Sequence, residues 1–155
     1  ETEILIVDAP AGASDNSIAF VGAADHVVVV LVGEPTSFLD AYSLIKAANV
    51  ESNVQNFNIV VNMARTASEA RAHFDKFNAT VGRFLDVNLK FAGHLPLSER
   101  MRRAIVQRRP IGMESGQLPE NRSFMAMSKA VLESPKNLHA GIRFFSENEA
   151  AAVGT

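Results

Sequence analysis

The chain has 155 residues, with 15 Lys and Arg against 17 Asp and Glu, and it contains no Cys and no Trp. Its length predicts one domain with a hydrophobic core, and its 47% hydrophobic and 21% charged residues argue against disorder. The absence of Cys excludes a disulfide framework, a thiolate zinc site and a cysteine nucleophile.

The charges are divided unevenly along the chain. Residues 1–89 carry 5 basic and 11 acidic side chains, a net charge of −6, whereas residues 90–155 carry 10 basic and 6 acidic ones, a net charge of +4. The basic part holds five arginines between residues 100 and 109. Such a cluster is usually the solvated face of a helix, and no aromatic residues alternate with it to stack on bases. We therefore expect no nucleic-acid partner.

The first part of the chain predicts strands alternating with helices. An apolar run at 4–7 predicts a strand that stops at the turn-forming residues 8–12, and residues 15–24 predict a short helix. The run at 27–32 is apolar throughout, which is typical of a strand buried on both faces of a parallel sheet, and it is too short to span a bilayer. After a loop at 34–37, apolar residues at helical spacing predict a helix: Phe38, Ala41, Ile45 and Ala48.

A third strand is predicted at 57–61, where it ends at Asn62. Thr66 and Glu69 have the spacing of a capping box that opens the next helix. The side chains that this helix is expected to bury are Ala70, Phe74, Phe77, Val81 and Leu85.

A fourth strand at 87–95 is closed by Pro96. Ser98 is expected to cap a fourth helix that turns Met101 and Ile105 inward and its arginines outward. Further predicted features are the end of this helix at Pro110, a Gly- and Pro-rich loop, a last helix near 120–133 and its stop at Pro135.

Four repeats of strand, loop and helix predict an α/β fold with a largely parallel sheet and flanking helices. Ligands of such sheets bind beyond the carboxyl ends of the strands. The polar residues that follow the predicted strands are Asp8, Glu34, Asn62 and those of the turn at 94–96. We therefore expect these four loops to line one edge of the sheet.

Two of these residues suggest nucleotide chemistry. The carboxylate of Asp8 can hold the water shell of Mg²⁺, and the N–H of Gly12 can approach a phosphate with no side chain intervening. The amide of Asn62 can both donate to and accept from a purine edge. The alternative for Asp8 and Asn62 is purely local, since both residue types favour turns by bonding to nearby backbone.

Three ordered motifs carry a resemblance to a known family. Residues 8–12 (DAPAG), 33–42 (GEPTSFLDAY) and 60–65 (VVNMAR) resemble the MinD/ParA branch of deviant-Walker P-loop ATPases. Within that branch, residues 34–46, 60–65 and 83–87 are most similar to the FlhG/FleN flagellar number regulators. The similarity runs from about residue 4 to about residue 145 with the spacing between motifs intact.

The resemblance implies roles for several residues. Asp8 would be the Walker B aspartate near Mg²⁺, and Pro10 and Gly12 would belong to the switch II segment that senses the γ-phosphate. Asn62 would contact the nucleotide base, with Arg65 beside it. Pro96 would form the other wall of the base pocket. Asp40 would lie at the interface of a dimer that encloses the nucleotides between its two subunits.

The residues also distinguish adenine from guanine. Guanine readers of the P-loop class usually place an Asp three residues after the Asn, where it accepts hydrogen bonds from the base. Arg65 stands at that position and only donates, so ATP with Mg²⁺ is the expected cofactor. The family's Pro-x-Asp is Pro96-Leu97-Ser98 here, which removes one carboxylate from the base pocket.

One family motif is absent. No G-x-x-x-x-G-K-[ST] phosphate loop occurs in the chain. Because phosphate contacts at that loop supply most of the nucleotide affinity, we expect this chain by itself to bind ATP weakly and to lack ATPase activity. Residues 1–134 are interpreted as a partial MinD-like domain from Walker B onward. Its sheet is expected to expose an apolar edge that a partner or a swapped oligomer covers.

The tail at 135–155 has a partly amphipathic sequence. Its apolar candidates for membrane contact are Leu138, Ile142, Phe144 and Phe145, with basic residues nearby. The alternative is that the tail packs on its own sheet, since Glu147 and Glu149 follow directly.

Two functions of different class remain open. In the first, the chain is part of an ATP-switched homodimer that controls flagellar number or placement, with flagellar proteins as partners, in the cytoplasm, at the inner membrane or at the cell pole. A cell-division or partition ATPase is a variant of it. In the second, the protein is a non-enzymatic MinD-like scaffold for pilus or polar assembly.

Overall fold

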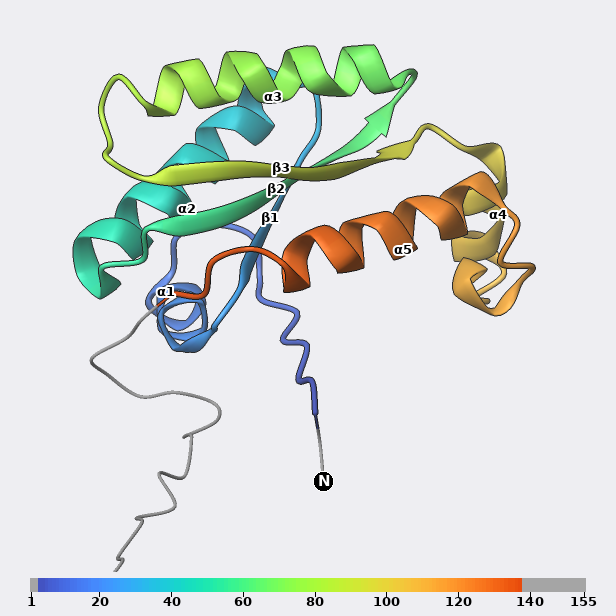
Figure 1. Cartoon of the computed structure of the whole chain (residues 1–155), viewed down its shortest axis with the longest axis horizontal. Helices are drawn as coiled ribbons and strands as arrows, with labels where there is room; N and C mark the ends of the chain where they lie inside the picture. Colours follow the sequence, from blue (N-terminus) through green and yellow to red (C-terminus); the bar gives the residue numbers. More distant parts are fainter. Residues whose placement is uncertain (1–2, 138–155) are drawn as a thin grey trace, which may run out of the picture.

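A computed structural model describes residues 3–137, and every structural statement below concerns these residues. Helices and strands alternate along the chain (Figure 1). In chain order the elements are α1 (Asp15–Ala23), β1 (Val27–Leu31), α2 (Pro35–Ser52), β2 (Asn56–Ala64), α3 (Ala67–Val81), β3 (Asn88–Pro96), α4 (Glu99–Val106), the 3₁₀ helix η1 (Ile111–Met113) and α5 (Pro119–Leu132).

The three strands form one parallel sheet in the order β1-β2-β3. Val27 lies opposite Phe57, and Phe57 lies opposite Leu89, so the amino ends of the strands are aligned. Each pair of neighbouring strands is joined through a helix, as parallel pairing requires. The predicted α/β class with a parallel sheet and flanking helices is confirmed.

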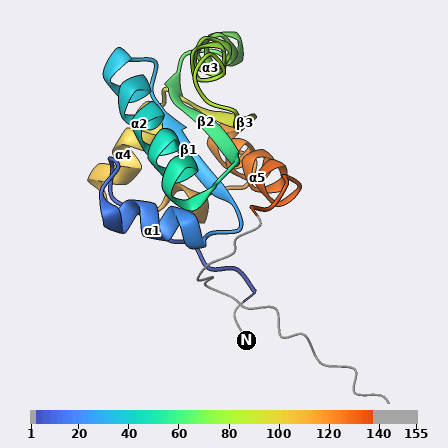
Figure 2. The same cartoon turned by 90° about the vertical axis from the view of Figure 1, so that its left-hand side faces the viewer.

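Helices cover the two faces of the sheet unequally. α2 and α3 lie on one face and α5 lies on the other, while α1 packs beside α2 next to β1 (Figure 2). The main core lies under α2 and α3, where Ile45, Phe57 and Phe77 are at most 1% exposed. A smaller cluster under α5 is centred on Val60, Ala92 and Met127.

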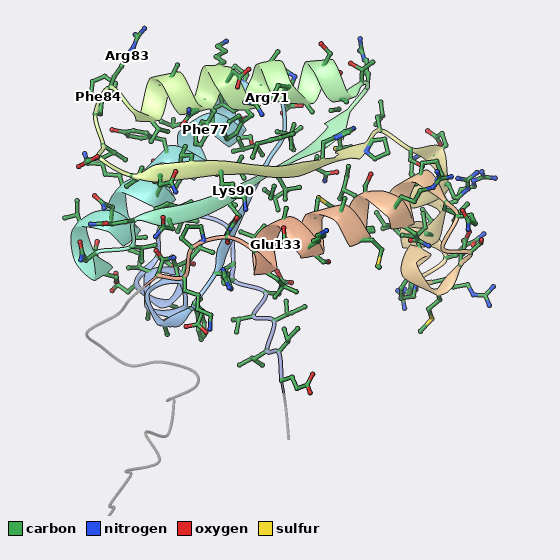
Figure 3. All side chains as sticks on the ribbon, viewed as in Figure 1. Arg71, Phe77, Arg83, Phe84, Lys90 and Glu133 are labelled. Atoms are coloured by element: carbon green, nitrogen blue, oxygen red, sulfur yellow. The ribbon has the colours of Figure 1, made fainter. Side chains whose placement is uncertain are left out.

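The predicted periodicity of α3 is confirmed. Its buried residues are Ala70, Phe74, Phe77 and Val81, which recur at helical spacing. Phe77 points from α3 toward the sheet, whereas Arg83 and Phe84, beyond the end of the helix, point away from it (Figure 3). Leu85 also lies beyond the helix and is half-buried.

The predicted strand at 4–7 is wrong. These residues form no ladder, and their side chains are exposed, up to 88% for Ile6. A strand needs a neighbour for its backbone hydrogen bonds, and the described residues supply none for this segment. The sheet therefore has three strands here instead of four.

The prediction that 27–32 is buried on both faces is also wrong. Val27, Val29 and Leu31 are buried in the core, but Val28 is 46% and Val30 is 55% exposed. The reason is that α5 packs on β3 and on Val60 of β2, which leaves the second face of β1 uncovered. The apolar edge was expected beside a strand at residue 4, which does not form; instead β1 is an edge strand with one uncovered apolar face.

Two of the predicted helix caps are confirmed. The side chains of Thr66 and Ser98 accept hydrogen bonds from the N–H groups of Glu69 and Met101. The prediction for Ile105 is wrong, since this side chain is 72% exposed, and α4 ends at Val106, before Pro110. No helix of the described residues is long and apolar enough to cross a membrane.

Candidate functional site

The carboxyl ends of β1, β2 and β3 lie at one edge of the sheet, because the strands are parallel. The loops after β2 and β3 are joined directly. Ala64 lies opposite Pro96, and the N–H of Leu97 donates to the carbonyl of Ala64 at 2.9 Å. This pairing joins the strand ends that carry three residues predicted for base binding, Asn62, Arg65 and Pro96.

Asn62 lies within β2, because this strand ends at Ala64, three residues beyond the predicted end at residue 61. The Oδ1 atom accepts a hydrogen bond from the N–H of Met63 at 2.9 Å. Met63 has a φ of 59°, and the ladder shifts register between Val61 and Ala64. This irregularity leaves Asn62 half-buried, with its Nδ2 atom donating to no other described residue. The amide can therefore donate to a ring nitrogen of a base and accept a second hydrogen bond on Oδ1.

Arg65 begins the loop between β2 and α3. Its N–H donates to Oε2 of Glu69 at 2.6 Å. In a standard capping box this carboxylate would accept from the N–H of the N-cap residue, Thr66, but here it accepts from the residue before it. The guanidinium of Arg65 is exposed and forms no ion pair with another described residue. It is available to a ligand at the carboxyl edge.

The loop after β1 is held by short contacts. Ser37 Oγ accepts the N–H of Val32 at 2.9 Å, in place of a side-chain cap from Glu34, the N-cap residue of α2. Gly33 lies directly against His73 of α3, since a Cβ atom at this position would overlap the Nε2 atom of the imidazole. An Ala at this position would require the His73 side chain to shift.

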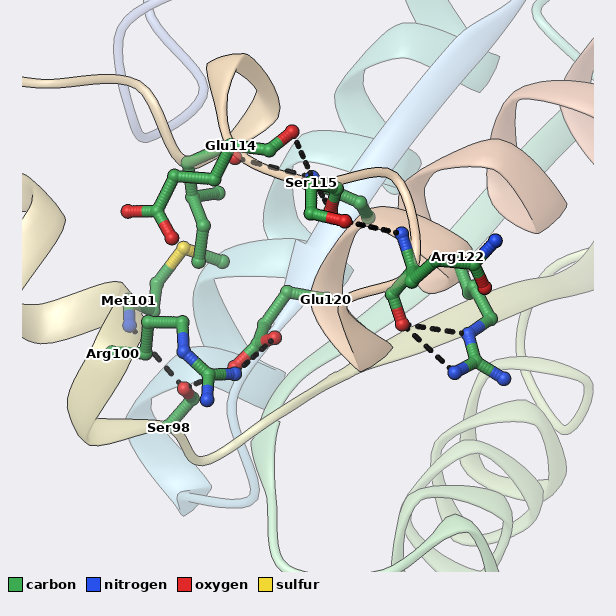
Figure 4. Close-up of polar contacts among 10 residues, drawn as sticks. Ser98, Arg100, Met101, Glu114, Ser115, Glu120 and Arg122 are labelled. Carbon is green, nitrogen blue, oxygen red and sulfur yellow. Dashed lines mark hydrogen bonds and ion pairs between the residues drawn. The ribbon is translucent and has the colours of Figure 1, made fainter.

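A buried carboxylate contacts the residues that follow β3 (Figure 4). Glu120 of α5 is 3% exposed and accepts a hydrogen bond from the hydroxyl of Ser98. Its other oxygen lies 3.3 Å from Nη1 of Arg100. The hydrogen bond from Ser98, with further help from Arg100, lowers the pKa of Glu120 below its ordinary value of 4.5, although burial acts in the opposite direction.

Sequence reasoning missed Glu120. It identified the loss of a family carboxylate at Ser98 and left the base pocket one acidic group short. The structure places a carboxylate next to the Ser98 hydroxyl, supplied from α5, which begins more than twenty residues later. An acidic residue in the first turn of a helix is usual for dipole reasons, so the sequence offered no signal for this contact.

The three residues predicted to sense phosphate and Mg²⁺ are not assembled with the base-binding residues. Residues 3–14 run outside the sheet, beside α1 (Figure 1). The carbonyl of Pro10 accepts a hydrogen bond from Ser17 of α1 at 3.2 Å, Gly12 has a φ of 93°, and Asp8 is exposed.

The donor set at this edge fits a purine better than a metal. The half-buried amide of Asn62 and the exposed guanidinium of Arg65 suit a base, whereas no group of three or more His, Asp or Glu within residues 3–137 could hold a metal ion. Asp8 therefore belongs to no such group among these residues. Asp40 is exposed on α2, and the predicted membrane residues 138–145 lie outside the described residues.

Comparisons with known proteins agree with this architecture. A family model for ParA, described as NUBPL iron-transfer P-loop NTPase, matches residues 1–132. The chain belongs to the ParA family. The MinD cell division protein of Aquifex aeolicus has the same fold, with a TM-score of 0.64 and 17% identity over 82% of this chain and 52% of that protein. The predicted resemblance to the ParA and MinD branch is therefore confirmed.

Two relatives of this ParA-family chain have flagellar names. The antiactivator FleN of Pseudomonas aeruginosa is 35% identical over 147 residues, which is 94% of this chain and 52% of FleN. The flagellum site-determining protein YlxH of Helicobacter pylori is 27% identical over 108 residues, 69% of this chain and 36% of YlxH. The chain thus spans about half or less of the length of these relatives.

Proposed function

We propose that this chain is part of a MinD/ParA-like ATPase that acts as an ATP-switched dimer and controls flagellar number or placement. The observation that carries the proposal is the 35% identity to the antiactivator FleN over 94% of this chain. The similarity to YlxH, a flagellum site-determining protein, supports the same biological role.

The carboxyl edge supports a nucleotide as the ligand. The pairing of Ala64 with Pro96, which joins the ends of β2 and β3, supports a shared role for Asn62, Arg65 and Pro96. This edge is where ligands bind in open α/β sheets. In the proposal, Asn62 reads the adenine edge, Arg65 lies beside the base and Pro96 forms the opposite wall. Asp8 holds the water shell of Mg²⁺ when the phosphate-binding part of the site is present.

Dimerisation and partners follow from the same proposal. Asp40 is exposed on α2 and is free to enter an interface between two nucleotide-bound copies. The partners are flagellar assembly or regulatory proteins, and the tail carries the membrane candidates named above. Since no phosphate loop is present in the sequence, this chain by itself is proposed to be inactive as an ATPase.

The direct test uses the full-length gene product. Equilibrium binding of a fluorescent ATP analogue with Mg²⁺ should weaken about tenfold or more on Asn62→Ala, because a base contact is removed. Asn88→Ala, at the amino end of β3, serves as a matched control and should leave binding unchanged. Asp8→Asn should abolish hydrolysis with a smaller effect on binding, whereas Asp86→Asn should not affect turnover.

Two further measurements separate the candidate functions. Sedimentation with a slowly hydrolysed ATP analogue should show a dimer that Asp40→Arg disrupts, and a deletion strain should have an altered number or position of flagella. A full-length protein that neither binds ATP nor dimerises with it, yet still acts in pilus or polar assembly, would support the scaffold alternative and rule out the switch.

A further inference from the structure

The helices α4 and α5 lie beyond the carboxyl end of β3 (Figure 1). Residues of α4, of α5 and of the loop between them line an apolar groove. Its volume is about 640 Å³. We call it the α4–α5 groove, and its apolar lining is Met101, Ala104, Ile105, Ile111, Phe124 and Met125. The nucleotide site proposed above uses none of these side chains.

The side chains on the groove are unusually exposed for their type. Ile105 is 72% and Met125 is 74% exposed, and the neighbouring Met113 is 86% exposed. Large apolar side chains gathered on one surface mark an interaction site more often than scattered ones do. The methionines are flexible and polarizable, so the surface can adapt to the side chains of a partner.

One wall of the groove is fixed by a buried amide. Asn121 is 7% exposed, and its Nδ2 atom donates to the carbonyls of Ile111, Glu114 and Ser115 at 3.2, 3.4 and 3.0 Å. Figure 4 shows Glu114 and Ser115 next to the start of α5. These bonds hold the loop between α4 and α5 in place, so the groove is formed before any partner arrives.

The rim of the groove is positively charged. Residues 97–125 contain 6 Arg and 3 Glu, a net charge of +3 in a chain whose total is −2. Two of the three carboxylates form ion pairs with nearby arginines, Glu99 with Arg102 and Glu120 with Arg100. Arg108 and Arg109 line the groove and pair with no carboxylate of residues 3–137.

Arg108 stands in a backbone conformation that favours glycine. Its φ is 53°, and the N–H groups of Arg108 and Arg109 donate to the carbonyls of Ile105 and Ala104, both at 3.0 Å. This is the hydrogen-bond pattern of a Schellman motif, whose left-handed position is usually Gly. An arginine at this position strains the backbone and places its guanidinium at the groove. Strained backbone positions of this kind are often found at functional sites.

We propose that the α4–α5 groove binds an amphipathic helix of a partner protein whose apolar stripe is flanked by carboxylates. The apolar stripe packs on Ile105 and Met125, and the carboxylates pair with Arg108 and Arg109. A helix in an apolar groove is a common mode of peptide recognition. Desolvated charge pairs at the rim then select acidic helices over basic ones.

Other occupants fit these observations less well. A second copy that docked through the same surface would bring equal positive charge against the rim. Nucleic acid would use the arginines but would leave the apolar lining without a function.

The test is a selection on the full-length protein. A display library of amphipathic helices about five turns long carries Leu, Ile and Phe on one stripe, with flanking positions varied among Glu, Gln and Lys. The selected peptides should be rich in Glu at the flanks. Their affinity should fall several-fold when salt rises from about 0.1 M to about 0.5 M, since rim charges are screened.

Variants assign the selected peptides to the groove. Ile105→Asp and the double change Arg108→Glu with Arg109→Glu should each weaken binding about tenfold or more. Arg102→Glu, on the same helix but outside the groove lining, should change it less than about twofold. Arg108→Gly keeps the left-handed position favourable for folding while removing the charge, and it should weaken binding in a fully folded protein.

Several results would overturn the proposal. One is that no selected peptide depends on the groove, and another is that the selected peptides have no excess of Glu. The proposal is also wrong if the protein binds anionic vesicles or duplex DNA, or associates with itself, and Ile105→Asp abolishes that binding. The proposal also fails if Ile105 is protected from solvent within the full-length monomer, measured by labelling of an Ile105→Cys variant.

Discussion

The hydroxyl of Ser98 donates a hydrogen bond to the buried carboxylate of Glu120, which joins the N-cap of α4 to the first turn of α5. The same Oγ atom accepts the N–H of Met101 at 3.2 Å. One serine therefore closes the start of α4 and fixes the loop after β3 to the opposite helix. The candidate base site and the α4–α5 groove share this anchor.

Glu120→Gln should destabilise the fold by about 1–2 kcal/mol near neutral pH, because Gln keeps the shape but loses the charge that accepts from Ser98 and Arg100. The pKa of Glu120 is lowered in the folded protein. Its contribution is therefore present above its unfolded value of 4.5 and is lost as the pH falls through the lower folded value. Urea unfolding at neutral pH and at strongly acidic pH, with Glu114→Gln as the control, measures this. Equal destabilisation at both pH values would contradict the prediction.

His26 should make the free energy of unfolding depend on pH in a range above that in which Glu120 titrates. Its Nδ1 atom lies 3.1 Å from Ser134 Oγ, which itself donates to the carbonyl of Val131. Burial lowers the pKa of His26 below 6.5, Lys136 and Lys90 lower it further, and Asp25 opposes them. Stability is therefore full above 6.5 and falls as the pH falls through the folded-state value.

His26→Asn should remove this part of the pH dependence, since an Asn side chain does not titrate and still offers an N–H to Ser134. Thermal unfolding of both proteins over the weakly acidic range gives the two slopes. Identical slopes would show that His26 does not contribute.

The aromatic side chains near the end of α3 should differ sharply in their contribution. Phe77 is 1% exposed in the main core, so Phe77→Ala should cost about 3–5 kcal/mol in the free energy of unfolding. Phe84 is 70% exposed, and Phe84→Ala should cost about 0.5 kcal/mol. Denaturant unfolding monitored by circular dichroism compares them, and similar losses would contradict the packing of α3 on the sheet.

Gly33→Ala should destabilise the loop after β1 by about 1–3 kcal/mol, because the new methyl group overlaps the His73 imidazole. His73→Ala removes the obstacle, so the double variant should recover most of the loss. A double-mutant cycle in urea measures the coupling between the two positions. An additive result would mean that the two residues are not in contact.

Much of the helical structure followed from local patterns. Thr66 and Ser98 were predicted as caps from their side-chain oxygens, and Ala70, Phe74 and Phe77 from a spacing that places them on one face. Both signals act within a few residues, so one sequence contains all the information needed. The family resemblance rests on ordered motifs of the same kind, and a family model over residues 1–132 confirms it.

The strands depended on partners instead. Residues 4–7 and the residues of β1 are equally apolar, yet only β1 is in the sheet, since only β1 has a neighbour in β2. Val28 and Val30 are exposed because α5 covers β2 and β3 but not β1. The sequence pattern of a strand does not indicate which helix will pack on it.

The sequence alone determined the α/β class and the family, because these properties depend on local spacing and motif order. It also indicated polar residues at or near the ends of the predicted strands. The tertiary structure decided which of those residues meet. It joined the ends of β2 and β3 through Ala64 and Pro96, left residues 4–8 outside the sheet, and brought Glu120 to Ser98 from a distant helix. Contacts between residues far apart in sequence depend on how helices pack on a shared sheet, and that packing exists only in the folded chain.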